Sequence, residues 1–351
     1  MRILIADVQV PFISGGAEAL ASGLLHACRS AGHEAELVTM PFRFFPDSEV
    51  IRAMQSWDEE NFNELNGYSA EIAVCLRFPA YCLDHRRKVV WLPHQHRAFY
   101  DLWNPSSPGN TPERLSVRKC VTAKDTAELS AAERVYTISQ RVTDRAKSFN
   151  GVFSTPLYHP PPLAGKLYCA QPQAYIFAPS RLEELKRQWL LIRAMRHVRA
   201  PVVALISGTG GQQNAYQQLI EELGLGHKVR LVGRLSEDEL AGYYACSLGV
   251  FFGPFDEDYG YITLEAMLSQ KPVITCKDSG GPLEFVIDQQ TGLVVDPDPE
   301  AVAGAIEYLW ANRQRAMELG AAGYSRYMDF HLSWDTVVNR LITPAPSPAA
   351  V

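Results

Sequence analysis

Short apolar runs alternate with amphipathic segments along almost the whole chain. Runs of this length, bounded by turns and separated by helical patterns, are typical of parallel strands in βαβ units. The first half predicts strands at Arg2–Ala6, Glu34–Thr39, Glu71–Leu76, Lys88–Leu92 and Arg134–Ile138. The second half predicts strands at Ala174–Ala178, Val202–Ile206, Val229–Val232, Leu248–Phe252, Pro272–Thr275 and Gly292–Val295. The pattern therefore predicts an α/β protein with two open sheets.

Helical periodicity is clearest after the first strand. One helical face is formed by residues spaced three or four apart, namely Ala17, Leu20, Leu24, Cys28 and Ala31. Gly32 follows as a C-cap. Near the end of the chain the pattern predicts helices at Glu300–Leu309, at Arg313–Met328, and from Trp334 onward with Ser333 as the N-cap.

Three consecutive prolines mark the boundary between the two halves. Pro160, Pro161 and Pro162 cannot lie inside a helix or a central strand, so we expect an extended linker over residues 155–172. The expected organisation is a first domain over residues 1–160, a second over 161–330, and a C-terminal helix within 331–351 whose proline-rich tail after Ile342 is frayed. A length of 351 residues fits two domains of about 100–200 residues each.

Composition mainly excludes classes of protein. Hydrophobic residues make up 47% and charged residues 21%, which excludes a disordered chain and a fibre. The net charge of −6 argues against a nucleic acid partner, because binding the phosphate backbone of a nucleic acid needs an excess of cationic side chains. The seven cysteines form no C-x-x-C pair, so we expect reduced thiols in a cytoplasmic protein. The first residues are typical of a strand rather than a signal peptide, and no apolar stretch reaches about 18 residues.

The most informative chemistry lies in residues 255–267. This segment follows a predicted strand and continues into a helix, and Gly260 permits a tight turn at the junction. The first backbone N–H groups of that helix, at Tyr261, Ile262 and Thr263, would then be free to bind an anion such as a phosphate.

Two carboxylates flank this turn, Glu257 before Gly260 and Glu265 after it. Because carboxylates repel a diphosphate, we expect them to accept hydrogen bonds from sugar and ribose hydroxyls. A glutamate pair at one spacing also arises by chance, and acidic residues favour helix N-termini, so the spacing alone leaves a structural role open.

The neighbouring motifs add a resemblance to a known family. After the E-x7-E pair come Lys271-Pro272-Val273-Ile274-Thr275, Ser279-Gly280-Gly281-Pro282-Leu283-Glu284 and Thr291-Gly292-Leu293-Val294. This run resembles the donor site of glycosyltransferase family 4, whose members have the GT-B fold. The resemblance covers nearly the whole chain. It implies two Rossmann-like, doubly wound domains facing across a cleft, with the final helix returning to the first domain.

The resemblance also assigns roles in the second domain. Arg181 and Lys186 match the family's Arg…Lys pair and would offset the charge of a nucleoside diphosphate. Taken alone, a solvated charged helix start accounts for them slightly better, and the family match reverses this preference. The family often has glycine where Ser180 and Arg187 stand. Gly208 matches a short glycine turn on the nucleotide side, although such turns are also routine loops.

In the first domain the resemblance singles out two loops. Gly15 and Gly16 lie where the first strand runs into the first helix, near the transferred sugar in the family; an ordinary flexible loop is the alternative. His94 matches the histidine that contacts the donor sugar. The role of His96 stays open, since two histidines also occur in metal sites but no further ligands stand at a recognisable spacing. Ser139 matches a family serine, and we favour an N-cap role for it.

The implied activity is retaining transfer of a hexose from a UDP- or GDP-linked sugar to a hydroxyl acceptor, in polysaccharide, glycolipid or glycoconjugate synthesis. Glu265 would hold the ribose and Glu257 the sugar, while Arg181, Lys186 and the helix after Gly260 stabilise the leaving group. The resemblance implies no metal and no cofactor besides the nucleotide sugar. The alternatives are a GT-B sugar-nucleotide epimerase and a non-catalytic nucleotide- or sugar-binding protein; a missing G-x-G-x-x-G motif disfavours an NAD dehydrogenase.

The sequence does not identify the acceptor. Residues 98–104 are aromatic and follow His94, so lining of the acceptor site and core packing are equally expected. Basic residues would give the first domain an affinity for an anionic membrane surface or a lipid phosphate, although a solvated charged face is the favoured explanation. These residues are Arg86, Arg87, Lys88, Arg97, Arg114, Arg118 and Lys119.

Overall fold

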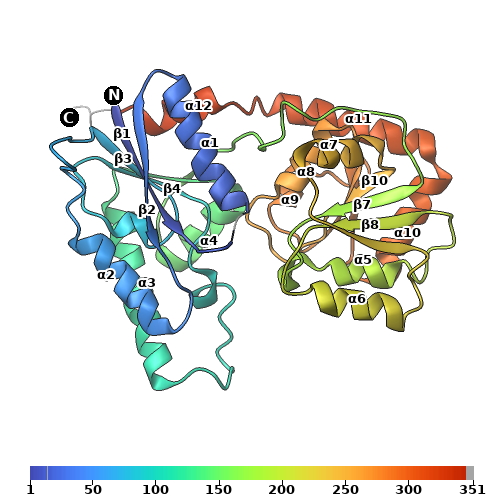
Figure 1. The fold of residues 1–351 in the computed structure, drawn as a ribbon, viewed down its shortest axis with the longest axis horizontal. Coiled ribbons are helices and arrows are strands. Elements are labelled where there is room, and N and C mark those ends of the chain that lie inside the picture. Colours follow the sequence, from blue (N-terminus) through green and yellow to red (C-terminus); the bar gives the residue numbers. More distant parts are fainter. Residues whose placement is uncertain (14, 345–351) are drawn as a thin grey trace. The chain divides into compact units, whose positions relative to one another are not determined.

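The structure, a computed structural model, describes residues 1–13 and 15–344 and divides into two compact units. The first unit contains Met1–His159 and the C-terminal segment from Ser333; the second contains Pro160–Leu332. Figure 1 labels the elements of both. The tail expected to be frayed lies outside the described residues from position 345 onward.

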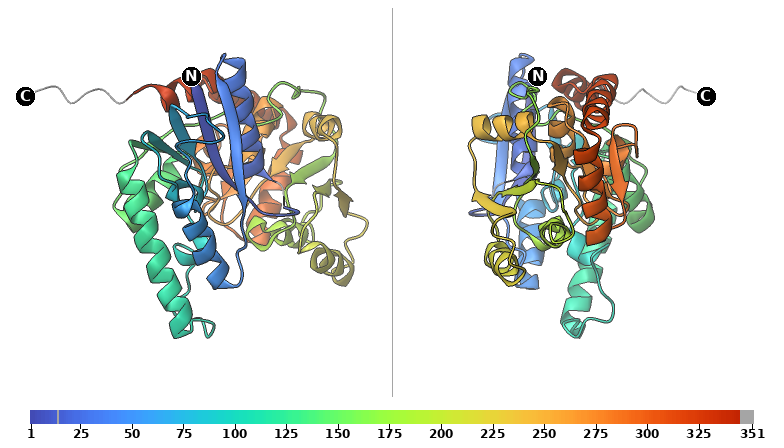
Figure 2. Two further views of the ribbon diagram at one scale, coloured as in Figure 1. Left: turned by 60° about the vertical axis from the view of Figure 1, so that its left-hand side comes forward. Right: turned by 90° about the vertical axis from the view of Figure 1, so that its right-hand side faces the viewer.

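The first unit is built on a six-stranded sheet in the order β2-β1-β3-β4-β5-β6, with every neighbouring pair parallel. Its strands are β1 (Arg2–Gln9), β2 (Glu34–Pro41), β3 (Ile72–Cys75), β4 (Lys88–Leu92), β5 (Arg134–Thr137) and β6 (Thr155–Pro156). Its helices are α1 (Gly16–Ser30), α2 (Asp47–Glu59), α3 (Pro112–Ala131), α4 (Gln140–Asn150) and α12 (Trp334–Ile342), with short 3₁₀ helices η1 (Ala80–Cys82) and η2 (Arg97–Phe99). Figure 2 shows that α3 reaches well beyond the strands of its own unit.

Local sequence explains most of these elements. The predicted apolar face of α1 is buried at Leu20, Leu24 and Cys28, and Gly32 follows the helix in a left-handed conformation, as expected for a C-cap region. One expectation was wrong: β6 starts where we placed the linker. Thr155 and Pro156 pair with the edge of β5, where a proline needs no partner for its missing N–H.

The C-terminal helix packs on the first unit, as expected. Ser333 caps α12 by accepting a hydrogen bond from the N–H of Asp335, and α12 contacts α1. Trp334 packs edge-on against Trp91 of β4 at 6.2 Å between ring centroids. It lies so close to α1 that a Cβ added at Gly23 would stand 2.4 Å from its ring.

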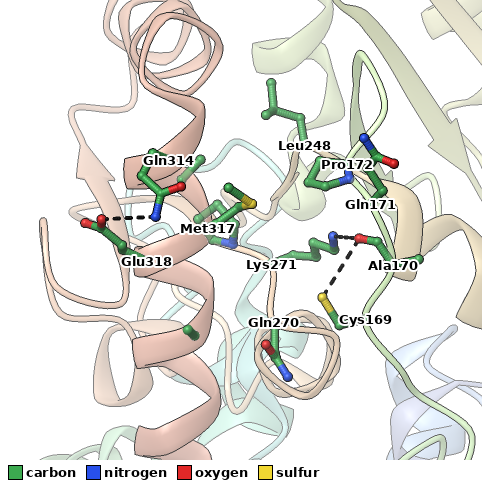
Figure 3. A pocket seen from close by; sticks show the side chains of 13 residues that line it. Cys169, Ala170, Gln171, Pro172, Leu248, Gln270, Lys271, Gln314, Met317 and Glu318 are labelled. Carbon is green, nitrogen blue, oxygen red and sulfur yellow. Dashed lines mark hydrogen bonds between the residues drawn. The ribbon is translucent and has the colours of Figure 1, made fainter.

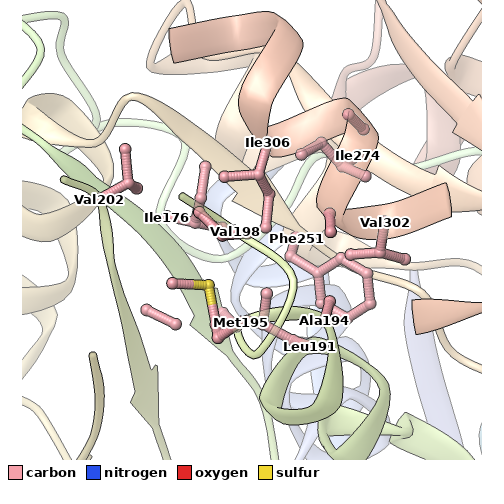
Figure 4. Close-up of a cluster of buried hydrophobic side chains, with 14 of the residues drawn as sticks. Ile176, Leu191, Ala194, Met195, Val198, Val202, Phe251, Ile274, Val302 and Ile306 are labelled. Atoms are coloured by element: carbon pink, nitrogen blue, oxygen red, sulfur yellow. The ribbon is translucent and has the colours of Figure 1, made fainter. Parts of the chain in front are cut away.

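The second unit has the strand order β12-β11-β10-β7-β8-β9, again with parallel neighbours only. Its strands are β7 (Tyr175–Pro179), β8 (Val203–Ser207), β9 (Val229–Gly233), β10 (Gly249–Phe251), β11 (Val273–Cys276) and β12 (Gly292–Val295). Its helices are η3 (Glu184–Lys186), α5 (Gln188–Ala194), α6 (Gln213–Glu222), α7 (Glu237–Cys246), α8 (Tyr261–Leu268), α9 (Pro282–Phe285), α10 (Pro299–Ala311) and α11 (Arg313–Asp329). Figure 4 shows the core where side chains of α5 and α10 meet the sheet.

The strand orders fix where ligands would bind. In each sheet the order reverses beside the unit's first strand, between β1 and β3 in one and between β7 and β10 in the other. Ligands of open parallel sheets bind outside the carboxyl ends of the strands at such a reversal. The loops after β7 and β10 carry Arg181, Lys186 and Glu257, so the fold places these residues at the reversal.

The cysteines and the apolar helices were also subjects of expectations from the sequence. The seven cysteines are all free thiols, and Cys28, Cys75, Cys82 and Cys276 are buried. Within residues 1–13 and 15–344, no helix is long and apolar enough to cross a bilayer.

Candidate functional site

Lys186 and Glu257 form an ion pair at the strand-order reversal of the second unit. The Lys186 ammonium, in the turn after β7, lies 2.5 Å from the Glu257 carboxylate, in the loop after β10. Both side chains are about four-fifths buried, with exposed fractions of 18% and 20%. The Lys186 ammonium also lies 5.8 Å from the centre of the Phe252 ring. The structure thus brings together two of the residues that the sequence singled out.

Arg181 lies on the surface of the same unit, in a loop that the glycine turn supports. The loop after β7 lies against the turn after β8, where the N–H of Leu182 donates to the carbonyl of Thr209. A Cβ at Gly208 would stand 1.8 Å from the carbonyl oxygen of Ser180, and the φ of Gly208 is +123°. Gly208 therefore has a structural reason to be glycine, because it lets the Arg181 loop approach.

The turn before α8 has the geometry expected from Gly260. This residue is the N-cap of α8 with a left-handed backbone, φ +94°. The expectation of three free N–H groups was wrong for Thr263, whose N–H donates to the carbonyl of Gly260 at 3.0 Å. Thr263 therefore offers no free N–H to an anion at this helix end. The Thr263 hydroxyl is buried, and no hydrogen-bond partner for it occurs among the described residues.

Glu265 is a buried carboxyl at the same helix. Its side chain accepts a hydrogen bond of 2.7 Å from the hydroxyl of Tyr244, on α7. Burial raises the pKa of Glu265 to about 7, and the Tyr244 hydroxyl opposes this rise. A carboxylate held in this way can accept hydrogen bonds from neutral hydroxyls at its remaining lone pairs.

Two long-range contacts near these residues were not predicted from the sequence, one made by Glu265 and one made by Arg187, the residue after Lys186. Tyr244 lies 21 positions before Glu265 on a different helix, and Asp278 pairs with Arg187 across 91 positions. No local sequence pattern links such distant positions. They come together only because β7, β10 and β11 are neighbours in one sheet.

In the first unit, the Gly15–Gly16 loop is held by an ionic network. The N–H of Gly15 donates to Glu18 at 2.8 Å, which completes the N-terminus of α1. Glu18 also accepts from the buried Arg77, whose guanidinium binds both oxygens of Asp7. Arg77, which was not among the predicted site residues, follows β3 at the strand-order reversal of this unit.

His94 and His96 differ in their surroundings. The Nδ1 of His94 donates to the carbonyl of Gln95 at 2.8 Å, which leaves Nε2 for another contact. His96 is buried among aromatic rings, stacked with Phe44 at 6.1 Å and packed against Phe99 at 4.7 Å. Burial lowers the pKa of His96 to about 4, so it is neutral near pH 7. Ser139 caps α4, accepting from the N–H of Val142, as favoured.

Most of the basic residues that the sequence singled out in the first unit are buried or paired, and the exposed ones are Arg86 and Lys119. Lys88 is buried and donates to two backbone carbonyls and to Glu128. Other members are paired, Arg87 with Glu133, Arg97 with Asp101 and Arg114 with Asp47. In the aromatic loop Phe99 and Tyr100 are buried, at 1% and 4% exposed, whereas Leu102 is 36% exposed.

The described residues contain a cavity but no cluster of metal-ligating side chains. In these ranges no group of three or more His, Cys, Asp or Glu side chains could hold a metal ion. A cavity of about 520 Å³ lies beside the amino ends of β10 and β11, opposite the ends that carry Lys186 and Glu257. Figure 3 shows Lys271 reaching across it, where its ammonium donates to the carbonyl of Ala170.

Comparisons with known proteins agree with this geometry. Residues 166–326 match the family model described as glycosyl transferases group 1. A GDP-mannose-dependent alpha-(1-6)-phosphatidylinositol monomannoside mannosyltransferase of Mycobacterium tuberculosis is 33% identical over 174 residues, 46% of this chain and 44% of the relative. A D-inositol 3-phosphate glycosyltransferase of Corynebacterium diphtheriae is 28% identical over 171 residues, 46% of this chain and 39% of the relative. The match thus spans less than half the length of either relative.

Solved structures resemble the chain over nearly its full length. Sucrose-phosphate synthase from Thermosynechococcus elongatus has a TM-score of 0.78 at 18% identity, covering 97% of this chain and 96% of that one. Anabaena HepE in complex with UDP and glucose has a TM-score of 0.70 at 18% identity, covering 97% and 98%. With the two Rossmann-like sheets, these likenesses show the GT-B fold.

Proposed function

We propose that the protein is a retaining hexosyltransferase of the glycosyl transferases group 1 family, whose model matches residues 166–326. Its donor is a nucleoside diphosphate sugar, bound by the second unit, and its acceptor is a hydroxyl group. The observation that carries the proposal is the Lys186–Glu257 pair at the strand-order reversal. The left-handed turn at Gly260 lies three residues after Glu257, and Glu265 follows in the first turns of α8.

The reaction breaks the bond between the sugar C1 and the β-phosphate oxygen, and forms a bond from C1 to the acceptor oxygen on the same face. The acceptor proton passes to the departing phosphate. The cations of Lys186 and Arg181 stabilise the negative charge that develops on this leaving group. No side chain has to act as a nucleophile.

The carboxylates fix the pose of the donor. Glu265, held by Tyr244, accepts hydrogen bonds from the ribose hydroxyls, and Glu257 accepts them from the sugar. Before the donor binds, Glu257 is neutralised by Lys186. Binding would therefore exchange this ion pair for contacts of Lys186 with phosphate and of Glu257 with hydroxyls. In the first unit, Gly15, Gly16 and His94 would contact the sugar and the acceptor.

The nucleotide of the donor is UDP or GDP. The names of the relatives support both, because one is GDP-mannose-dependent and the solved HepE structure holds UDP and glucose. The acceptor class stays open among glycans, lipid-linked sugars and small molecules. Contact with a membrane surface would need features other than the paired basic residues of the first unit.

Thermal shift with UDP, GDP, UDP-glucose and GDP-mannose tests donor binding. A ligand of the folded state at 100 times its Kd stabilises by about 2.7 kcal/mol. We expect a shift with the nucleotides of one base, and its loss in Lys186→Ala. Lys166→Ala is the control, because Lys166 is an exposed lysine of the same unit, paired on the surface with Glu237 and Asp238.

Turnover is measured as nucleotide release from the bound donor. We expect Lys186→Ala and Glu257→Ala each to lower it at least 100-fold, the scale of losing one preorganised electrostatic group. Full activity in both variants would show that the site is wrong. Binding without release of nucleotide, even with acceptors present, would favour a binding protein, and conversion of the sugar without transfer would favour an epimerase.

We also propose that no metal takes part, following the family resemblance. Dialysis against EDTA should then leave the rate of nucleotide release unchanged, and adding Mg²⁺ or Mn²⁺ afterwards should not raise it. Loss of activity in EDTA that is restored by one cation would contradict this.

A further inference from the structure

Arg187 occupies a backbone position that favours glycine. Its φ is +52°, in the left-handed region, and it directly follows Lys186. Arginine is uncommon in this conformation, because its Cβ crowds the following carbonyl. Where a non-glycine residue persists in such a position, its surroundings usually hold it there.

The contacts of the Arg187 guanidinium hold the residue in this conformation. It donates to the backbone carbonyls of Gly253 and Pro254 at 2.9 and 2.8 Å. It binds both carboxylate oxygens of Asp278 at 2.8 and 2.6 Å. The guanidinium also lies 5.8 Å from the centre of the Phe255 ring. With 11% of its side chain exposed, Arg187 is a largely buried clamp.

Three chain segments meet at this clamp, namely the Lys186 turn, the loop after β10 that carries Glu257, and the segment after β11. The N–H of Phe255 donates to the carbonyl of Leu185 at 2.7 Å, which joins the Lys186 turn to the loop after β10. The N–H groups of Asp256 and Glu257 donate to the carbonyls of Asp278 and Ser279, both at 2.9 Å. These bonds join the same loop to the segment after β11.

We propose that Arg187 is a positioning residue that holds Lys186 and Glu257 in register for the donor. This rests on the proposed function for the role of those two residues. Arg187 belongs to the Lys186 turn, and its side chain reaches both other segments, so its contacts fix the loop after β10 relative to its two neighbours. Its charge is balanced by Asp278, so it positions the pair without adding an unpaired cation to the site.

The chemistry of arginine is essential to this role. A planar guanidinium can bind a carboxylate with two parallel bonds while its remaining N–H groups reach the two carbonyls. A lysine at the same position keeps the charge but offers a single ammonium in place of the fork. Glycine would suit the backbone and remove every side-chain contact. Arg187→Lys therefore removes the forked contacts while keeping the charge, and Arg187→Gly removes them while keeping the backbone conformation.

The test measures nucleotide release from UDP-glucose and GDP-mannose with Arg187→Gly and Arg187→Lys. We expect kcat/KM to fall roughly 10- to 100-fold in both, the scale of a misplacement of about 1 Å. Arg193→Lys is the matched control, because Arg193 is exposed on the next helix and stacks on Trp189. Unchanged kcat/KM in Arg187→Gly would overturn the proposal.

A double-mutant cycle separates positioning from general destabilisation. If Arg187 acts through Lys186, then Arg187→Gly should add little to the loss already caused by Lys186→Ala. Losses that multiply in full would overturn positioning and leave a structural role alone.

Amide hydrogen exchange tests the clamp without any donor. In Arg187→Gly the amides of Asp256 and Glu257 should exchange at least tenfold faster, whereas those of β7 should not change. Unchanged protection at both amides would overturn the clamp. If the unmodified chain turns over neither donor, the proposed function fails, while the exchange rates still decide whether Arg187 holds this loop.

Discussion

At the scale of single residues, Glu265 combines a proposed donor-binding role with an environment that disfavours its charge. Its folded-state pKa of about 7 lies above the ordinary value of 4.5, because the ionised carboxylate is buried. The folded state therefore keeps a proton that the unfolded chain releases between these two pH values. Stability falls as pH rises through that window, by about 3 kcal/mol in total.

Glu265→Gln should remove this penalty. The amide stays neutral, and its oxygen can still accept the hydrogen bond from Tyr244. We expect the free energy of unfolding of the variant, relative to that of the unmodified protein, to increase by about 3 kcal/mol as the pH rises from 5 to 8, measured by urea unfolding. The affinity for the donor should fall, because an amide accepts hydrogen bonds from ribose hydroxyls less strongly than a carboxylate does. A gain independent of pH would contradict the raised pKa.

Residue-level inference from the sequence had a clear limit. Glu257, Glu265 and Gly260 could be found because they share one short segment with a recognisable spacing. The surroundings of a charged side chain could not, and Lys88 shows why. It looks like a surface cation in sequence, but its carboxylate partner Glu128 lies 40 residues away on α3.

At the scale of elements, the turn after β8 should tolerate no side chain. Gly208→Ala places a Cβ 1.8 Å from the carbonyl of Ser180 and forces a residue with φ +123°. We expect a loss of about 3 kcal/mol or more in urea unfolding, from overpacking and backbone strain together.

Gly226→Ala is the control for Gly208→Ala. An added Cβ there has no atom within 4 Å, so its stability should change by less than about 1 kcal/mol. Nucleotide binding should weaken in Gly208→Ala alone, because the Arg181 loop must move. Equal effects of the two substitutions would show that the close approach at Gly208 is unimportant.

Elements were predictable where burial follows the strand pattern. β4 and β12 have the predicted limits, because their apolar runs are bounded by turn residues. β6 was missed, since two residues ending in proline carry no strand pattern and pair only through the edge of β5. The free N–H expected at Thr263 was lost to a bond within the first turn of α8, which no sequence pattern specifies.

At the scale of the whole molecule, α12 should stabilise the first unit selectively. Val337 and Leu341 are fully buried on it, so the double variant Val337→Ala/Leu341→Ala should cost about 5 kcal/mol. Hydrogen exchange should accelerate in α1 and β4 and stay unchanged in β7 and α8. Asn339→Ala, on the exposed side of α12, serves as the control. Equal acceleration in both units would contradict selective stabilisation.

The docking of α12 also sets an order for making the protein. The first unit needs residues from both ends of the chain, with Pro160–Leu332 between them. At about 5–20 residues per second, a ribosome spends roughly 9–35 s on that intervening stretch. During this time α1 and β4 have been synthesised, but the surface that receives Trp334 stays open. The second unit can complete its core first, so the first unit is the last to be finished although most of it is synthesised earlier.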